Sequence, residues 1–151
     1  MTTAGNTFLD TNILLRATLP IMPLHREAVS LVTTQRTVGA RLWISRQIIR
    51  EYIAVVTRPQ TFLTPLSMGE VTAQIQIFER LFIIADDTAE VTAHLLALLQ
   101  EHPTGGKQVH DANVVATMLA FGISTLLTQN VDDMRRFSGK IVIIPLHAAP
   151  S

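Results

Sequence analysis

Carboxylates are scarce in this chain, and four of them stand where they could act together. Asp and Glu account for only 12 of the 151 residues. Four carboxylates that met in space would repel one another unless a cation joined them. Oxygen ligands of this kind are what a hard divalent metal such as Mg²⁺ prefers. The four acids are dispersed along the chain: Asp10, Glu51, Asp111 and Asp133.

Each of these acids also has a purely structural explanation when it is considered alone. Asp10 lies between a predicted strand and a predicted helix, where Asp is often a cap or turn former. Glu51 fits a solvated position on a helix. Asp111 and Asp133 fit the first turns of helices, where negative charge is favourable. The chemical interpretation therefore depends on whether the fold brings the acids together.

The hydrophobic pattern predicts strands that alternate with helices. Short, almost wholly apolar runs indicate strands, and such strands are typical of a mainly parallel sheet that is buried on both faces. The alternation favours an α/β fold. The expected strands are 7–9, 42–44, 82–85, 123–128 and 141–144, and the expected helices are 13–17, 24–35, 45–56, 67–82, 87–100, 107–121 and 130–137.

Capping residues mark where several of these helices begin. Thr11 or Asn12 can cap the first helix, and Ser45 can cap the third. The segments 67–70 and 87–90 both have the capping-box pattern, an N-cap residue followed three positions later by Glu. These signals predict helix starts from local sequence alone.

The order of the predicted elements suggests where the acids lie. In open parallel sheets, functional sites form beyond the carboxyl ends of the strands. Asp10 ends the first predicted strand, and Asn130 and Asp133 follow strand 123–128. Glu51 lies inside the helix after the second strand, and Asp111 lies near the start of its helix, so both can face the same edge. We expect the acids to gather there.

Length and composition are consistent with one domain over residues 1–151, with 1–6 and 147–151 as loose termini. Hydrophobic residues make up 48% of the chain, and the mean hydropathy is +0.32, which suggests a surface that another subunit covers. The 12 basic residues balance the 12 acidic residues. Net charge therefore neither indicates nor excludes a nucleic-acid partner.

Several other classes of protein and site are disfavoured. The absence of cysteine excludes disulfides and zinc–thiolate sites and favours a reducing cytoplasm. The N-terminus has no signal-peptide pattern. The stretch 112–131 carries no charge, but its polar residues and Gly122 favour a helix, a glycine stop and a buried strand over a membrane span. Asp86 and Asp87 could form a metal pair, although Asp87 also fits a helix cap.

Four segments, in this order and spacing, resemble PIN-domain nucleases, most closely the VapC-type toxins of bacterial toxin–antitoxin pairs. They cover nearly the whole chain, and the first and third are the most specific. One departure is that Met134 follows the last acid, where the family often has an aromatic residue, so either Asp133 or Asn130 could complete the site. The segments are Phe-Leu-Asp10-Thr-Asn-Ile-Leu-Leu, Ile-Ser45-Arg-Gln-Ile-Ile-Arg-Glu51-Tyr, His110-Asp111-Ala-Asn-Val-Val-Ala and Leu-Leu-Thr128-Gln-Asn130-Val-Asp-Asp133.

The resemblance implies a three-layer α/β/α PIN-like fold with a short, mainly parallel sheet of about five strands. It also implies a metal-dependent endoribonuclease, in which a metal-bound water attacks the phosphodiester in line and leaves 5′-phosphate and 3′-hydroxyl ends. The carboxylates would hold Mg²⁺ or Mn²⁺, and three polar residues would orient a carboxylate or the substrate. The implied metal ligands and catalytic residues are Asp10, Glu51, Asp111 and Asp133, and the implied orienting residues are Thr11, Asn12 and Asn130.

The resemblance further implies partners. VapC-type toxins act on RNA, dimerise, and are neutralised by a small antitoxin that lays an apolar segment and a basic side chain into the acidic groove. A cytoplasmic protein with no membrane association is expected. Two alternatives remain: a non-catalytic RNA- or protein-binding PIN module, and a stand-alone PIN nuclease that processes RNA without an antitoxin.

Overall fold

A five-stranded parallel sheet lies at the centre of the molecule. The computed structural model describes residues 5–59 and 64–147. The strands are β1 (Asn6–Leu9), β2 (Arg41–Ser45), β3 (Ile83–Ala85), β4 (Thr125–Thr128) and β5 (Val142–Pro145). They lie in the order β3-β2-β1-β4-β5, and every neighbouring pair is parallel.

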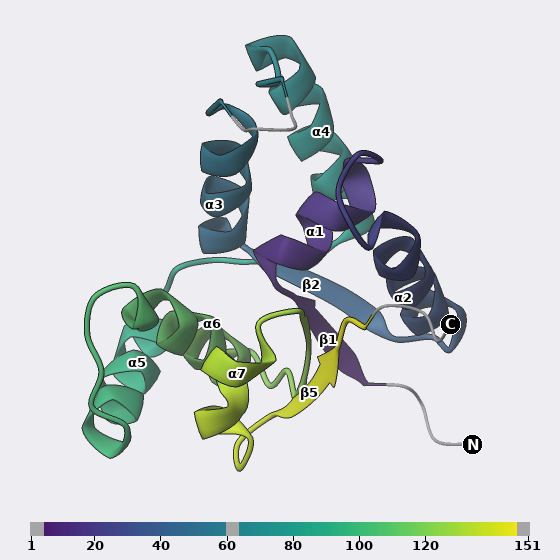
Figure 1. Cartoon of the computed structure of the whole chain (residues 1–151). Coiled ribbons are helices and arrows are strands. Elements are labelled where there is room, and N and C mark those ends of the chain that lie inside the picture. The colour runs from purple at the N-terminus through teal and green to yellow at the C-terminus, as the bar shows by residue number, and fades with distance from the viewer. Residues whose placement is uncertain (1–4, 60–63, 148–151) are drawn as a thin grey trace.

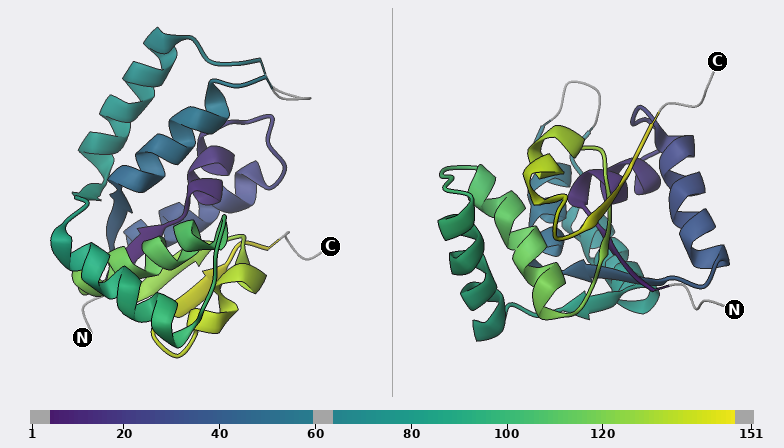
Figure 2. Two further views of the ribbon diagram at one scale, coloured as in Figure 1. Left: turned by 90° about the vertical axis from the view of Figure 1, so that its left-hand side faces the viewer. Right: turned by 90° about the horizontal axis from the view of Figure 1, so that it is seen from below.

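Helices cover both faces of this sheet. Figure 1 shows α1 and α2 on one side and α5 and α6 on the other, with α3 and α4 projecting beyond the sheet. Figure 2 shows α5 and α6 crossing in front of the strands. This arrangement confirms the predicted three-layer α/β/α fold. The helices are α1 (Thr11–Thr18), α2 (His25–Thr37), α3 (Arg46–Val56), α4 (Met68–Leu81), α5 (Ala89–Glu101), α6 (Gln108–Ala120) and α7 (Val131–Met134), which runs into a 3₁₀ turn at Arg135–Phe137.

The middle strand, β1, sets the position of the site. Its Phe8 and Leu9 are fully buried, as a strand covered on both faces requires. Phe8 is aligned with Trp43 of β2 and with Leu126 of β4. The chain then leaves the sheet at Asp10, whose backbone N–H still donates to Leu127 of β4. Asp10 is therefore held to the sheet at the carboxyl end of its central strand.

Two of the predicted caps are confirmed. The Ser45 hydroxyl accepts from the backbone N–H of Ile48 and begins α3. Ser67 and Glu70 form a complete capping box at the start of α4. In both places the cap depends only on residues close in sequence, which is why the pattern predicted it.

Two other predicted caps are wrong. Asp10, rather than Thr11 or Asn12, is the N-cap of α1, because its carboxylate accepts from the Thr11 N–H at 2.8 Å. At α5 the N-cap is Thr88 and not Asp87, because the Asp87 carboxylate pairs instead with an arginine of α3 at 3.1 Å.

The structure tests the prediction of a loose N-terminus. Asn6 belongs to β1, and its side-chain oxygen accepts from the indole N–H of Trp43 at 3.0 Å, so the loose terminus predicted for 1–6 is wrong at this residue. Residues 1–4 and 148–151 lie outside the described residues.

Within the described part, no helix is long and apolar enough to cross a membrane. The stretch 112–131 spans α6, a turn at Gly122 with φ +69°, and β4, as predicted.

Ser45→Ala tests how much the cap of α3 contributes. The substitution removes the acceptor for the Ile48 N–H at a fully buried position, so we expect the free energy of unfolding in urea to fall by about 1 kcal/mol. Ser30→Ala, at an exposed position inside α2, is the matched control and should change stability by less than about 0.5 kcal/mol. Equal effects of the two substitutions would contradict a capping role.

Candidate active site

An acidic pocket of about 400 Å³ lies at the carboxyl ends of β1 and β4, between α1, α3 and α6. Three of the four predicted acids line it, and each comes from a different part of the chain. Asp133 is not among the lining residues. The pocket is lined by Asp10, Thr11, Asn12, Leu15, Glu51, Ala54, Val55, Asp111 and Asn130.

Asp10 is the most buried of the acids, with 7% of its surface exposed. One carboxylate oxygen accepts from the Thr11 N–H, and the other accepts from the Thr128 hydroxyl at 2.8 Å and from the Asn12 amide at 3.4 Å. Burial nevertheless raises the pKa of Asp10 from 3.8 to about 6; the hydrogen bonds from Thr128 and Thr11 oppose this shift, and the charges of Glu51 and Asp111 add to it. The hydrogen bonds to Asp10 therefore offset only part of the cost of burying its charge.

Glu51 is fixed through both of its carboxylate oxygens. It lies on α3, where Oε2 accepts from the Thr11 hydroxyl at 2.7 Å and Oε1 accepts from the amide of Gln47 at 2.9 Å. Thr11 thus serves two acids, because its backbone N–H binds Asp10 while its hydroxyl binds Glu51. Thr11 therefore connects the carboxylates of Asp10 and Glu51 through two hydrogen bonds.

Asp111 lies in the first turn of α6 and is partly buried. Burial raises its pKa, and the negative charges of Asp133 and Glu51 raise it further, whereas Arg136 opposes the shift. Asp133 itself is exposed on α7. Asp133 therefore lies at the rim of the site, close enough to raise the pKa of Asp111.

The predicted orienting residues lie at the junction of α1 and the segment after β4. The side-chain oxygen of Asn12 accepts from the backbone N–H of Gln129 at 3.0 Å. Asn130 lines the pocket, and its backbone N–H donates to the Thr128 hydroxyl at 2.9 Å. The same hydroxyl donates to Asp10, so Thr128 links Asn130 to the central acid.

Three residues of the site were not assigned roles from the sequence. Thr128 carried a signal, because a polar residue at the carboxyl end of a buried strand faces the functional edge. Gln47 carried a weaker one, since it lies one helical turn before Glu51 and shares its face. Arg136, whose guanidinium donates to Gln108 at 3.1 Å and lies over the Phe137 ring, had none.

The alternative metal pair at Asp86 and Asp87 lies outside the pocket. These carboxylates pair with Arg46 and Arg50 of α3 at 3.0 and 3.1 Å. All four side chains are more than 40% exposed, so the pairs contribute little stability. They join the loop before α5 to α3 at the surface.

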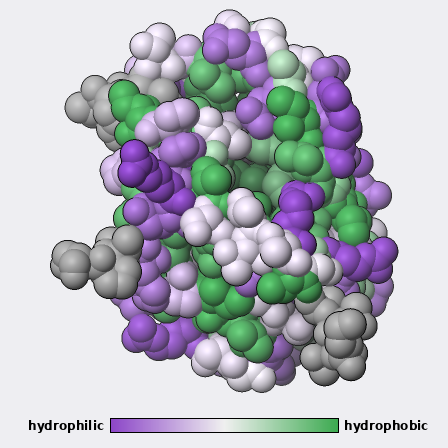
Figure 3. All heavy atoms as spheres, turned by 90° about the vertical axis from the view of Figure 1, so that its right-hand side faces the viewer, coloured by the Kyte–Doolittle hydropathy of each residue, from purple (hydrophilic) through white to green (hydrophobic). Residues whose placement is uncertain are grey.

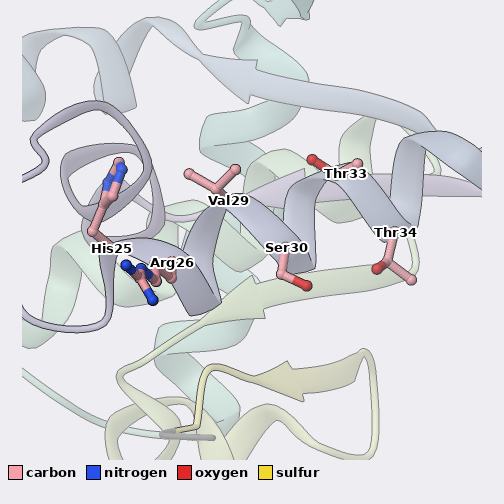
Figure 4. Close-up of a pocket in the computed structure, with 6 residues that line it drawn as sticks. All are labelled: His25, Arg26, Val29, Ser30, Thr33 and Thr34. Carbon is pink, nitrogen blue, oxygen red and sulfur yellow. The ribbon is translucent and has the colours of Figure 1, made fainter.

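Two other hollows differ from the acidic pocket in the residues that line them. An apolar groove of about 480 Å³ runs between α1, α2 and α4, and Figure 3 shows hydrophobic side chains around a hollow on the face that carries α2. A smaller hollow of about 320 Å³ follows α2 alone (Figure 4), and none of its described lining residues is acidic. The described residues that line the apolar groove are Leu14, Ala17, Thr18, Val29, Val32, Thr33, Arg36, Gln74, Ile77, Phe78, Leu81 and Phe82.

The donor set of the acidic pocket fits a partly hydrated divalent cation. Among the described residues, no three His, Cys, Asp or Glu side chains converge closely enough to form a ready-made cage for an ion. Mg²⁺ does not require one, because it keeps several waters and is usually held by one or two carboxylates. Burial is the main cause of the raised pKa values of Asp10 and Asp111 and neighbouring carboxylates add to both, so a cation would stabilise the ionised forms of these acids.

Comparison with known proteins identifies the fold. The family profile of the PIN domain matches residues 7–140. A comparison with curated proteins found no significant match. Similar solved structures include VapBC2 of Rickettsia felis bound to a promoter DNA fragment (18% identity, TM-score 0.65, covering 94% of this chain and 99% of that one). Others are the sarcin–ricin loop cleaving toxin VapC20 of Mycobacterium tuberculosis (17%, 0.62, 80% and 86%) and VapBC-1 of nontypeable Haemophilus influenzae (17%, 0.64, 93% and 98%).

The raised pKa of Asp10 predicts a pH dependence of stability in EDTA. The folded protein binds this proton more tightly than the unfolded chain, so the contribution of Asp10 to stability is full below pH 4 and is lost as pH rises through about 6. We expect Asp10→Asn to lack this decline. The free energy of unfolding of Asp10→Asn, relative to that of wild type, should therefore rise by up to about 3 kcal/mol between pH 4 and pH 7.

Urea unfolding at several pH values measures this difference. Asp132→Asn, which removes an exposed carboxylate of α7, is the control and should follow wild type throughout. A constant difference between wild type and Asp10→Asn across the pH range would show that burial does not perturb Asp10.

Proposed function

The chain belongs to the PIN-domain family, and from this premise we propose that it is a metal-dependent endoribonuclease of the cytoplasm and the toxin of a type II toxin–antitoxin pair. The observation that carries the proposal is the single pocket that Asp10, Glu51 and Asp111 line together at the carboxyl edge of a parallel sheet. Three carboxylates in one pocket suit a divalent cation and are poorly suited to binding RNA phosphates by themselves.

The carboxylates that line the pocket are the proposed metal ligands. Asp10, Glu51 and Asp111 would hold Mg²⁺ or Mn²⁺, and Asp133 would contribute from the rim through its effect on Asp111. When bound, such an ion lowers the pKa of a coordinated water and stabilises negative charge on the leaving oxygen of a phosphodiester.

The remaining residues keep these carboxylates in place. Thr128 and the Thr11 N–H each donate to a different oxygen of Asp10 and so orient its carboxylate. Asn12 ties the start of α1 to the segment after β4. Asn130 lines the pocket and is proposed to orient the substrate. Preorganised groups of this kind favour the transition state because they need not reorganise during the reaction.

The apolar groove supports the proposal of an antitoxin partner. The similar structures from Rickettsia felis and Haemophilus influenzae are VapBC proteins, and another is a toxin–antitoxin complex from Klebsiella pneumoniae. We propose that an antitoxin lays an apolar segment along the groove between α1, α2 and α4 and a basic side chain into the acidic pocket. Val29, Ile77 and Leu81 line this groove and are at least 40% exposed, which favours a protein partner. A homodimer is also proposed, because large hydrophobic side chains outside this groove, such as Leu96 and Val142, are also exposed.

Asp10→Asn and Asp111→Asn test the catalytic assignment. Each removes a negative charge from the proposed metal site, and we expect cleavage of RNA with Mg²⁺ or Mn²⁺ to fall by roughly 1,000-fold, since a bound metal supplies several kcal/mol of transition-state stabilisation. EDTA should abolish the cleavage by wild type. Asp132→Asn should keep full activity. Wild-type rates in both pocket variants would exclude this site.

Expression in bacteria separates the toxin from its alternatives. Growth arrest that needs Asp10 and is relieved by the product of a neighbouring short reading frame would support a toxin–antitoxin pair. An active nuclease without toxicity would favour a stand-alone enzyme of RNA processing. Metal-independent RNA binding without cleavage would favour a non-catalytic module.

A further inference from the structure

Gln47 is buried where α3 meets the start of α6, with 5% of its surface exposed. Its amide nitrogen donates to Glu51 Oε1 and to the backbone carbonyl of His110, both at 2.9 Å. Its amide oxygen accepts from the side chain of Asn113 at 2.8 Å. One side chain thus joins an acid on α3 to the backbone and a side chain of α6.

The orientation of this amide is determined by its partners. A carboxylate and a backbone carbonyl can only accept, so the Gln47 nitrogen must face them, and both of its N–H groups are used. Asn113 then donates to the remaining oxygen. Reversing the amide would place an oxygen against two acceptors, and removing it would break both of the hydrogen bonds that join Gln47 to α6.

The bridge spans the position of Asp111 on both sides. His110 precedes Asp111 directly, and Asn113 follows it by two residues in the same helix. Elsewhere α3 packs mainly on α1, β2 and α4, whereas α6 packs mainly on α5 and α7. Because α3 and α6 share little other packing, the polar bridge through Gln47 is well placed to set the separation of Glu51 and Asp111.

This separation matters because the two acids repel each other. The charge of Glu51 raises the pKa of Asp111, so the two carboxylates interact across the gap between the helices. Thr11 holds Glu51 from the side of Asp10, and Gln47 holds it from the side of Asp111. Without the second contact, Glu51 keeps its hydrogen bond from Thr11 but loses the link to α6 that runs through Gln47.

We propose that Gln47 is a positioning residue that sets the distance between Glu51 and Asp111 and thereby the affinity of the pocket for a divalent cation. The proposal rests on the metal-dependent function proposed above. It assigns Gln47 no contact with metal or substrate. Hydrogen-bonding partners of metal ligands typically change metal affinity by about 10- to 100-fold when they are removed.

Mn²⁺ binding to the purified full-length chain, measured by calorimetry without RNA, tests the proposal. We expect Gln47→Met, which keeps the shape but removes all three hydrogen bonds, to weaken Mn²⁺ binding by roughly 10- to 100-fold. Gln35→Met is the matched control. Gln35 is a partly buried amide that joins α2 to Thr7 of β1 at 3.3 Å, outside the pocket, so its loss should leave Mn²⁺ affinity unchanged.

The metal dependence of RNA cleavage distinguishes positioning from general stability. Gln47→Met should need more Mn²⁺ for half-maximal cleavage but recover towards the wild-type rate at saturating Mn²⁺, because all of the acids are still present. Asp111→Asn should not recover. A purely structural role would lower the melting temperature of Gln47→Met and Gln35→Met alike without changing the Mn²⁺ requirement, and that result would overturn the proposal.

Asn113→Leu provides a second route if Gln47→Met folds poorly. It frees the oxygen end of Gln47 and should weaken Mn²⁺ binding in the same direction but less; the double variant should bind no more weakly than Gln47→Met, because both residues act in one bridge. Wild-type affinity in both single variants overturns the role of Gln47 while leaving the metal site intact. A wild-type chain that neither binds Mn²⁺ nor cuts RNA overturns the proposed function itself.

Discussion

The burial of carboxylates close to one another in one pocket is the constraint on which the rest of this structure depends. Burial is the largest cause of the raised pKa values of Asp10 and Asp111, and repulsion from the neighbouring carboxylates adds to both shifts. The fold opposes the repulsion with a continuous set of donors that runs from β4 through α1 to α3 and α6. The donors are Thr128, Thr11 and Gln47. Each engages an acid, and Thr11 and Gln47 also join two helices.

The parallel sheet makes this arrangement possible because it delivers several chain segments to one edge. β1 lies in the middle of the sheet and ends at Asp10, so that acid is surrounded by the ends of its neighbours. Asp10 has two roles that share the same atoms: it caps α1 and it lines the pocket. The structural and functional explanations of this residue are therefore compatible, and the cap itself helps to orient the carboxylate.

Features that depend on neighbouring residues were predicted well, whereas competition between distant groups was not. The strands, the cap at Ser45 and the capping box at 67–70 follow from local pattern, and the structure confirms them. The cap of α5 was mispredicted because Arg50, distant in sequence, takes the Asp87 carboxylate. Within the proposed site, Asp133 could be placed near the edge by its position after β4, but its exposure at the rim followed from how α7 turns.

The sequence by itself determined the alternation of strands and helices, the identity of the scarce acids and their order along the chain. These are properties of hydrophobic spacing and residue type, which need no partner from elsewhere. Only the tertiary structure decided which acids meet and what holds them. Glu51 and Asp111 belong to different helices, and the amide that joins these helices, Gln47, has partners four, 63 and 66 residues away. Hydrogen bonds over such separations depend on how elements pack in three dimensions, and no local pattern of residues specifies them.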